Sequence, residues 1–140
     1  MVRVSIMPVL LLVVVGIVTA GCSTRQAETA APKAEVVDAG TFEKLAGGGD
    51  DVVVLDVRTP EEYASGHVPG AVNLDINSPG FDQKLSELAP GKTYLVYCRS
   101  GGRSTRACSA MAAQKVPAKA IYNLDGGITA WQSAGKPVEK

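Results

Sequence analysis

The chain has 140 residues, of which 46% are hydrophobic and 20% are charged, and its 14 basic and 14 acidic side chains give a formal net charge of zero. This composition is too apolar for a disordered chain, and the length suits one domain. The balanced charge leaves no basic field with which the chain could bind nucleic acid by bulk electrostatics.

The first 21 residues resemble an export signal rather than part of a fold. Arg3 is the only charge ahead of an apolar run at 9–18, which is too short to span a bilayer, since that takes about 20 residues. The run ends in Thr19-Ala20-Gly21-Cys22, which resembles the lipobox of bacterial lipoproteins, although Thr19 stands where that family usually has leucine. The resemblance implies that residues 1–21 are removed and that Cys22 is lipidated. An ordinary cleaved signal peptide, or an uncleaved anchor with an incidental Cys22, is the alternative.

Lipidation would decide where the protein resides. Acyl chains on Cys22 would anchor the exported protein to the outer face of a bacterial membrane, in the periplasm or at the cell surface. Residues 22–34 are polar, rich in alanine and aperiodic. We therefore expect a flexible tether at 22–34 that holds a folded domain, residues 35–138, off the membrane.

Within the domain, short apolar runs alternate with helical patterns. The apolar runs, bounded by turn residues, predict strands at 35–38, 52–56, 71–74, 94–97 and 119–124. The patterns between them predict helices at 41–46, capped by Thr41, and at 59–65, 81–88, 104–114 and 126–134. Strands that alternate with helices predict an α/β fold with a parallel sheet covered on both faces.

The stretch around Cys98 carries the clearest chemical signal. The strand at 94–97 ends at Cys98, two adjacent glycines follow at 101–102, and an alanine-rich helix begins after Arg103. A strand, a glycine loop and a helix in this order direct backbone N–H groups and the positive end of a helix toward one point. Because Arg99, Arg103 and Arg106 are close to Cys98 in the sequence, we expect a Cys98 thiolate, the nucleophilic form, near neutral pH. A small core cysteine is the alternative.

Three segments resemble the rhodanese family of thiosulfate and persulfide sulfurtransferases. The loop at 98–104, Cys-Arg-Ser-Gly-Gly-Arg-Ser, is similar to the active-site loop of that family. Residues 55–63 and 66–71 resemble its N-terminal signature, and residues 123–131 resemble its C-terminal one. The resemblance implies a single rhodanese-like α/β domain with a five-stranded, mostly parallel sheet, helices on both faces, and the loop beyond the C-terminal ends of the strands.

The resemblance also implies a reaction. In the family, a donor such as thiosulfate or a persulfide gives its outer sulfur to the cysteine, and the resulting persulfide passes it to cyanide or a thiol. Cys98 then corresponds to the nucleophile, and Arg103 to the loop-closing arginine, which ties the loop or faces an anionic donor. Arg99 is the candidate for binding the oxyanion end of thiosulfate. The substrate-binding residues, whose backbone N–H groups we expect around the sulfur, are Arg99, Ser100, Gly101, Gly102 and Ser104.

Other chemically notable residues have structural interpretations. We expect Asp56 and Arg58 to pair with each other, and His67, the only histidine, to be a hydrogen-bonded loop residue. Trp131 is interpreted as a core anchor, and Cys108 as a small buried residue, with a resolving thiol for the nucleophile as the alternative. One histidine and no paired-cysteine spacing predict neither a metal site nor a cofactor.

Two other functions stay open. Cysteine-dependent phosphatases also enclose an anion between a cysteine and an arginine, and one such family shares the rhodanese fold, but its loops are one residue longer than the four that separate Cys98 from Arg103. The shorter loop suits a sulfur atom rather than a phosphoryl group. A non-catalytic binding module would be marked by loss of the cysteine, which this chain retains. We expect a monomer whose partners are a sulfur donor, a thiol or cyanide acceptor, and a membrane.

Overall fold

The computed structural model describes residues 31–140. The export signal at 1–21, Cys22 and most of the tether lie outside the described residues, so cleavage, lipidation and location stay predictions. Within 31–140, the helices are too short or too polar for any of them to cross a membrane.

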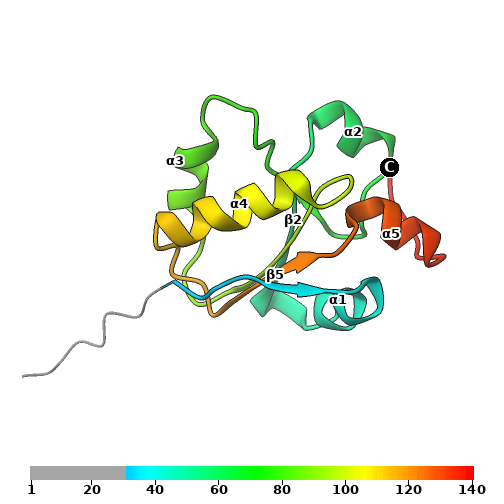
Figure 1. Ribbon diagram of the computed structural model, residues 1–140, viewed down its shortest axis with the longest axis horizontal. Coiled ribbons are helices and arrows are strands. Elements are labelled where there is room, and N and C mark those ends of the chain that lie inside the picture. The colour runs from blue at the N-terminus through cyan, green and yellow to red at the C-terminus, as the bar shows by residue number, and fades with distance from the viewer. Residues whose placement is uncertain (1–30) are drawn as a thin grey trace, which may run out of the picture.

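Five strands form one sheet, and every neighbouring pair of strands is parallel (Figure 1). The strands are β1 (Glu35–Val37), β2 (Val52–Asp56), β3 (Val72–Asn73), β4 (Thr93–Tyr97) and β5 (Ala120–Leu124). Their order across the sheet is β1-β5-β4-β2-β3. The parallel five-stranded sheet confirms the fold class that the sequence predicts.

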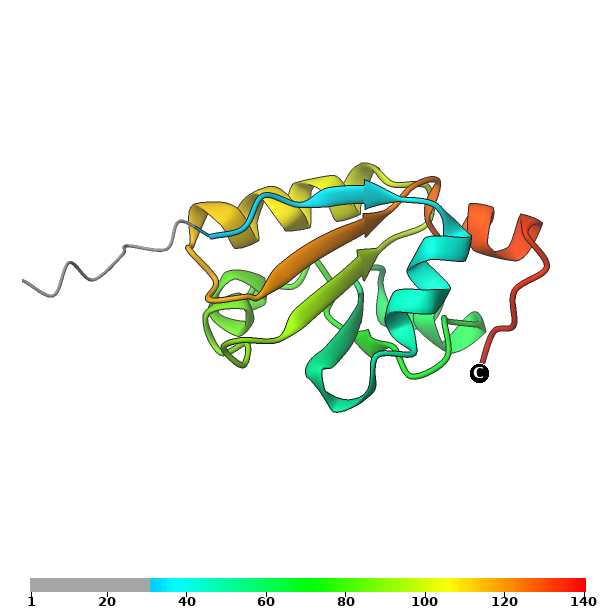
Figure 2. The same ribbon diagram turned by 90° about the horizontal axis from the view of Figure 1, so that it is seen from below.

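Helices pack on both faces of this sheet, as predicted. They are α1 (Ala39–Ala46), α2 (Pro60–Ser65), α3 (Phe81–Ser86), α4 (Gly102–Ala113) and α5 (Gly127–Ser133), with a 3-10 turn η1 (Gly49–Asp51) before β2. One apolar core joins α3 and α4 to the sheet, and a second core joins α1 and α5 to its other face. Figure 2 shows α4 and α1 on opposite sides of the strands. The two cores make the sheet the rigid middle layer of the domain.

The central strand β4 is buried on both faces, which is why it lacks the alternation of polar and apolar residues typical of half-buried strands. Leu95 and Tyr97 pack into the core of α1 and α5. Tyr94 and Val96 pack into the core of α3 and α4. None of the four is more than 1% exposed. The residue that follows β4 is therefore attached to one of the most tightly packed strands of the fold.

Several element boundaries differ from the sequence prediction. α1 begins at Ala39, and its cap is Asp38 rather than Thr41, because Asp38 Oδ1 accepts a hydrogen bond from Thr41 N at 2.7 Å. α4 begins at Gly102 rather than at residue 104, and Gly101 precedes it in a left-handed conformation with φ of 107°. Two elements are clearly shorter than predicted: α3 stops at Ser86 rather than at residue 88, and β3 has only two residues rather than four.

Candidate active site

The loop between β4 and α4 places Cys98 at the C-terminal edge of the sheet. β4 ends at Tyr97, Cys98 follows directly, and α4 begins at Gly102 (Figure 1). Because the strands are parallel, this edge also collects the loops that follow β2 and β5, and ligands bind at such edges in open α/β sheets. Cys98 is only 1% exposed, so its sulfur lies within the loop rather than on the surface.

The Cys98 sulfur receives hydrogen bonds from the residues that follow it. Gly101 N donates to Sγ at 3.1 Å, and the Ser104 hydroxyl lies 3.5 Å from Sγ. Burial raises the pKa of the Cys98 thiol. The hydrogen bonds from the Ser104 hydroxyl and from the backbone amides of Ser104, Gly101 and Ser100 lower this pKa by more than burial raises it, so the net shift is downward. The structure thus gathers Ser100, Gly101 and Ser104 at the sulfur, where they favour the thiolate.

The Ser104 hydroxyl has two acceptors for one proton. It lies 3.0 Å from Gly101 O as well as 3.5 Å from Cys98 Sγ. A charged acceptor binds a hydroxyl more strongly than a neutral carbonyl does. Ionisation of Cys98 therefore draws this proton toward the sulfur, whereas a neutral thiol leaves it on Gly101.

The turn into α5 holds the loop from another side. Ile128 N donates to Cys98 O at 2.9 Å, and the backbone N and Oγ1 of Thr129 donate to Arg99 O at 3.2 and 3.0 Å. Gly127 allows this contact, because its φ is +59° and a Cβ there would lie 2.4 Å from Cys98 O. Two backbones therefore meet here with no room for a side chain. The sequence motif at 123–131 includes this glycine but does not indicate its contact with Cys98.

Arg103 is held by Glu62 of α2. Nη1 lies 2.6 Å from Oε2 and Nη2 lies 2.7 Å from Oε1, and the two side chains are 25% and 31% exposed. The hydrogen bonds from Arg103 are the main reason that the pKa of Glu62 is lowered to about 2. Of the two roles expected for Arg103, the structure shows the tie, which joins α4 to α2.

Glu62 is the functional residue that sequence reasoning missed. Its carboxylate also accepts from Thr59 N at 3.2 Å, while Thr59 Oγ1 accepts from Glu62 N at 3.3 Å. This reciprocal capping box orients Glu62 at the start of α2. The Thr-x-x-Glu spacing at 59–62 is visible in the sequence and could have indicated a fixed carboxylate, although not its partner.

Arg99 lies on the outer side of the same loop. Its side chain is exposed, and no hydrogen bond or ion pair within residues 31–140 holds its guanidinium. Arg99 lines a cavity of about 360 Å³ together with Arg58, Glu62, Thr129 and Gln132. A free guanidinium at the edge of this cavity can bind an anion. Gly102, in contrast, makes no hydrogen bond to the Cys98 sulfur.

A buried ion pair lies at the ends of the strands β2 and β4, next to the Cys98 loop. Asp56 is fully buried and accepts hydrogen bonds from Arg58 N, Nε and Nη2 at 2.6–3.0 Å and from the Tyr97 hydroxyl at 2.6 Å. Arg58 Nη2 also donates to Gly66 O at 2.8 Å. Burial, and then the hydrogen bond to Asp56, raise the pKa of Tyr97, which therefore stays a donor. The pairing agrees with the structural role predicted for Asp56 and Arg58.

The other notable residues also have structural environments. His67 Nδ1 lies 3.1 Å from Tyr63 O, and the His67 ring stacks on Tyr63 at 3.8 Å. Trp131 is 2% exposed, and its indole N–H donates to Pro137 O at 2.7 Å. Burial raises the pKa of Cys108 to about 12, so this thiol is neutral and unreactive at ordinary pH. Within residues 31–140, no group of three metal-ligating side chains comes together.

The fold and the loop define a parallel α/β domain that holds one activated cysteine at the edge of its sheet. Residues 38–134 match the family model described as the rhodanese-like domain. The chain therefore belongs to the rhodanese-like domain family, as its three motifs predict.

Two relatives and one solved structure agree with this assignment. A sulfurtransferase of Allochromatium vinosum is 33% identical over 102 residues, which cover 73% of this chain and 92% of that protein. The thiosulfate sulfurtransferase GlpE of Pseudoalteromonas translucida is 32% identical over 85 residues, which cover 61% of this chain and 77% of that protein. Among solved structures, a rhodanese-related protein from Thermoplasma volcanium matches with a TM-score of 0.64 and 28% identity, over 75% of this chain and 97% of the other.

Proposed function

We propose that this protein is a sulfurtransferase that carries sulfane sulfur as a persulfide on Cys98. The observation that supports this most is the environment of the Cys98 sulfur, which accepts from Gly101 N and faces the Ser104 hydroxyl. These donors lower the pKa of the thiol against the effect of burial. A buried sulfur that favours the charged form is a nucleophile that needs no separate general base.

In the first step, the Cys98 thiolate attacks the outer sulfur of a donor such as thiosulfate. A new S–S bond forms as the S–S bond of thiosulfate breaks, and sulfite leaves with that bond's electron pair. The negative charge then rests on the outer sulfur of the persulfide. The N–H and O–H donors of the loop, which face the thiolate beforehand, are already oriented for this charge.

In the second step, cyanide or a thiolate attacks that outer sulfur. The acceptor forms the new bond to sulfur, the S–S bond to Cys98 breaks, and Cys98 leaves as the thiolate with the electron pair. The products are thiocyanate or an acceptor persulfide, and the enzyme returns to its starting form. No net oxidation, reduction or proton transfer is needed in either step.

The two arginines have different roles in this proposal. Arg99, whose guanidinium is exposed beside the cavity of about 360 Å³, attracts the sulfonate oxygens of thiosulfate. Arg103 contributes by fixing the loop, because both of its terminal nitrogens are bonded to Glu62. Export and a lipid anchor at Cys22, which lie outside the described residues, would place this chemistry on the outer face of a membrane.

The test is the intact mass of the protein after incubation with thiosulfate. We expect a gain of one sulfur atom, its removal by cyanide with release of thiocyanate, and no gain in Cys98→Ser. Cys108→Ser is the matched control, because that buried thiol is predicted to take no part, and it should gain sulfur as the wild type does. Sulfur transfer that persists in Cys98→Ser would overturn the proposal.

The same proteins separate the alternatives. A cysteine-dependent phosphatase would hydrolyse a phenyl phosphate ester and lose that activity in Cys98→Ser, whereas a sulfurtransferase should leave the ester intact. A non-catalytic binding module would show neither a mass gain nor ester hydrolysis.

A further inference from the structure

The cavity that Arg99 lines lies between α2 and α5, and residues of both helices line it. The Cys98 loop is bonded to both of these helices: Glu62 of α2 accepts from Arg103, and Thr129 of α5 donates to Arg99 O (Figure 1). A molecule in this cavity therefore lies against the loop that holds the sulfur.

Arg58 lines the same cavity and has a nitrogen that its ion pair does not use. Nε and Nη2 of Arg58 bond to Asp56, and Nη2 also bonds to Gly66 O. Nη1 has no hydrogen-bond partner within residues 31–140, and it is not among the side-chain atoms there that are both fully buried and unpartnered. Arg58 as a whole is 4% exposed. Its Nη1 therefore keeps some accessible surface and can donate to a molecule in the cavity.

The charges around the cavity favour an anion. Both carboxylate oxygens of Glu62 accept from Arg103, and the charge of Arg58 is balanced by Asp56. Arg99 is then the one charged residue of the lining without an ionic partner in the described structure. A free guanidinium and a largely buried N–H donor together suit an acid group such as a carboxylate.

The size of the cavity suits an organic molecule. Its volume of about 360 Å³ lies within the range of small-molecule sites and is much more than a sulfite ion fills. The acid group of a ligand therefore leaves room for a carbon chain.

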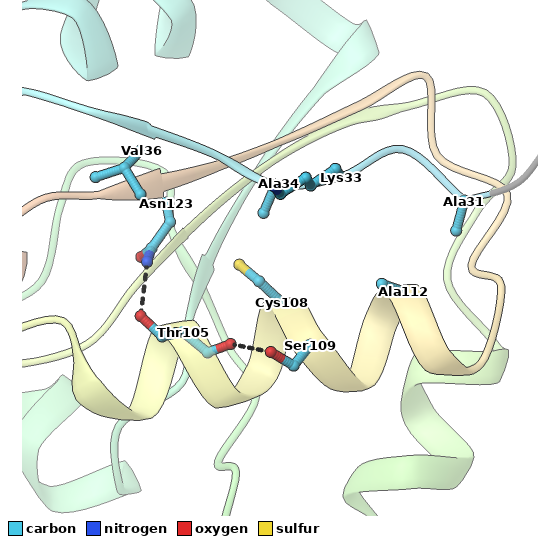
Figure 3. Close-up of a pocket in the computed structure, with 9 residues that line it drawn as sticks. All are labelled: Ala31, Lys33, Ala34, Val36, Thr105, Cys108, Ser109, Ala112 and Asn123. Atoms are coloured by element: carbon cyan, nitrogen blue, oxygen red, sulfur yellow. Dashed lines mark hydrogen bonds between the residues drawn. The ribbon is translucent and has the colours of Figure 1, made fainter.

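A cavity of similar size elsewhere in the chain lacks this chemistry. It has a volume of about 330 Å³ and lies between the residues of β1 and α4 (Figure 3). Among residues 31–140, the only charged one that lines it is the exposed Lys33. A buried guanidinium with a free nitrogen therefore distinguishes the cavity between α2 and α5.

We propose that the cavity between α2 and α5 binds the acid group of the sulfur acceptor, so that the preferred acceptor is a small thiol that carries a carboxylate. This inference rests on the proposed function, in which sulfite leaves before the acceptor arrives and so vacates the approach to the sulfur. Arg58 is then a substrate-binding residue as well as the partner of Asp56.

The acid group is bound but takes no part in the bond changes. The carboxylate bonds to Arg58 Nη1 and to the guanidinium of Arg99. The thiolate of the same molecule attacks the outer sulfur of the Cys98 persulfide, the S–S bond breaks, and Cys98 leaves as the thiolate with the electron pair of that bond. The product is the persulfide of the acceptor.

The kinetic test uses two acceptors that differ in the acid group. 3-Mercaptopropionate carries a carboxylate, and 3-mercaptopropionamide carries a neutral amide of nearly the same shape. Because the transfer has two separate steps, kcat/KM for the acceptor reports the second step alone. The ratio of the two kcat/KM values, acid over amide, is then compared between variants, so that the different acidities of the two thiols cancel.

Two variants add the same charge at different places. Gln132→Glu adds it to the lining of the cavity, at an exposed position of α5. We expect the ratio to fall roughly fivefold, the factor for two like unit charges about 4 Å apart in water. Ser109→Glu is the matched control, because it adds a carboxylate beside the cavity between β1 and α4 at an exposed helix position. The ratio should not change in this control.

A binding measurement tests Arg58 without any sulfur transfer. 3-(Methylthio)propionate has the acid group but no thiol, and it is titrated into the isotope-labelled full chain, as is its neutral amide. The NMR signals of the Nε–H groups of Arg58 and Arg99 are followed. We expect saturable shifts of both signals with the acid and none with the amide.

The inference is overturned if either guanidinium signal fails to shift with the acid, or if Gln132→Glu keeps the wild-type ratio. Formation of thiocyanate from thiosulfate and cyanide separates this failure from that of the proposed function. If cyanide accepts sulfur in the same preparations, the proposed function stands and only the acidic acceptor is wrong. If neither cyanide nor either thiol accepts sulfur, the proposed function is wrong, and this inference with it.

Discussion

The guanidinium of Arg103 donates two hydrogen bonds to the carboxylate of Glu62, from Nη1 to Oε2 at 2.6 Å and from Nη2 to Oε1 at 2.7 Å. The two residues are 41 positions apart in the chain. Arg103 lies in the first turn of α4, and Glu62 lies in the first turn of α2. The pair therefore joins the segment after β4 to the segment after β2 across the edge of the sheet where Cys98 lies.

Glu62→Gln should weaken both the fold and the loop. We expect a loss on the order of 1 kcal/mol of unfolding free energy at pH 7, because the pair has two-point geometry but is partly screened by solvent. Sulfur transfer should fall as well, since the loop loses its tie. Urea unfolding and a thiosulfate–cyanide assay measure the two effects. Glu61→Gln, an exposed neighbour on α2 without a partner in the described structure, should change either quantity little.

The contribution of Glu62 should also depend on pH. Its pKa is lowered from an ordinary 4.5 to about 2, so the folded state holds the ionised form more strongly than the unfolded state does. The stabilisation is therefore complete above about pH 4.5 and is lost as the pH falls toward 2. The difference in stability between wild type and Glu62→Gln should shrink across this window. A difference of constant size from pH 7 to pH 2.5 would contradict the assignment.

Ser104→Ala should make the Cys98 thiol less acidic. The variant removes the hydroxyl that lies 3.5 Å from the sulfur, while Gly101 N still donates. Alkylation by iodoacetamide at pH 7 should slow by roughly 3- to 10-fold, which corresponds to the loss of one ordinary net hydrogen bond of about 0.6–1.4 kcal/mol. The pH dependence of the alkylation rate should move upward at the same time. Ser109→Ala is the control, since that hydroxyl donates to Thr105 O on the exposed side of α4. An unchanged pH profile in Ser104→Ala would remove Ser104 from the set of donors.

Gly127→Ala should displace the Cys98 loop. The new Cβ would lie 2.4 Å from Cys98 O and 2.6 Å from the Arg99 carbonyl carbon, at a residue whose φ is +59°. We expect a cost of about 2–4 kcal/mol from the clash and the backbone strain together, and nearly complete loss of sulfur transfer. Gly91→Ala separates the backbone strain from the clash, because Gly91 has φ of +73° but no atom within 4 Å of its Cβ position. That control should lose only about 1–2 kcal/mol and keep its activity.

Asp56→Asn should destabilise the fold more than any change at the surface of the site. It leaves Arg58 charged, 4% exposed and without its ionic partner. The expected cost is about 3–5 kcal/mol, measured by urea unfolding. Tyr97→Phe, which removes one donor to Asp56 but no charge, should cost only about 1–2 kcal/mol. Equal losses in the two variants would show that the ion pair is not the important part of this network.

The fold could be predicted from the sequence because its signals are local. The run at 52–56 and the strand before Cys98 are apolar along their whole length, and such runs alternating with helices define a parallel sheet. The first residue of α1 was harder to predict, because Asp38 and Thr41 are both good capping residues and lie three positions apart. The carboxylate of Asp38 takes the cap, and Thr41 becomes the residue whose N–H is capped.

The site could be predicted only where it lies within one stretch of chain. Cys98, Gly101 and Ser104 belong to one strand, loop and helix, so their convergence follows from sequence order. Glu62 and Thr129 lie in α2 and α5, the helices that follow β2 and β5, and the strand order β1-β5-β4-β2-β3 brings both beside β4. Nothing local to 98–104 indicates these partners, because they depend on how the sheet is assembled.

The burial of Cys98 bears on which sulfur atom of the proposed persulfide, the inner Sγ or the outer sulfur, a reagent from solvent can attack. Cys98 is 1% exposed, and a second sulfur bonded to it would extend about 2 Å beyond Sγ. In the persulfide that we propose, the inner sulfur keeps the buried position of Cys98 Sγ, and the outer sulfur is the atom that an incoming reagent attacks. Peroxide that reached the loaded site would oxidise the outer sulfur, and two thiols that then reduce the S–S bond would release the oxidised sulfur, form a disulfide between themselves and restore the Cys98 thiol.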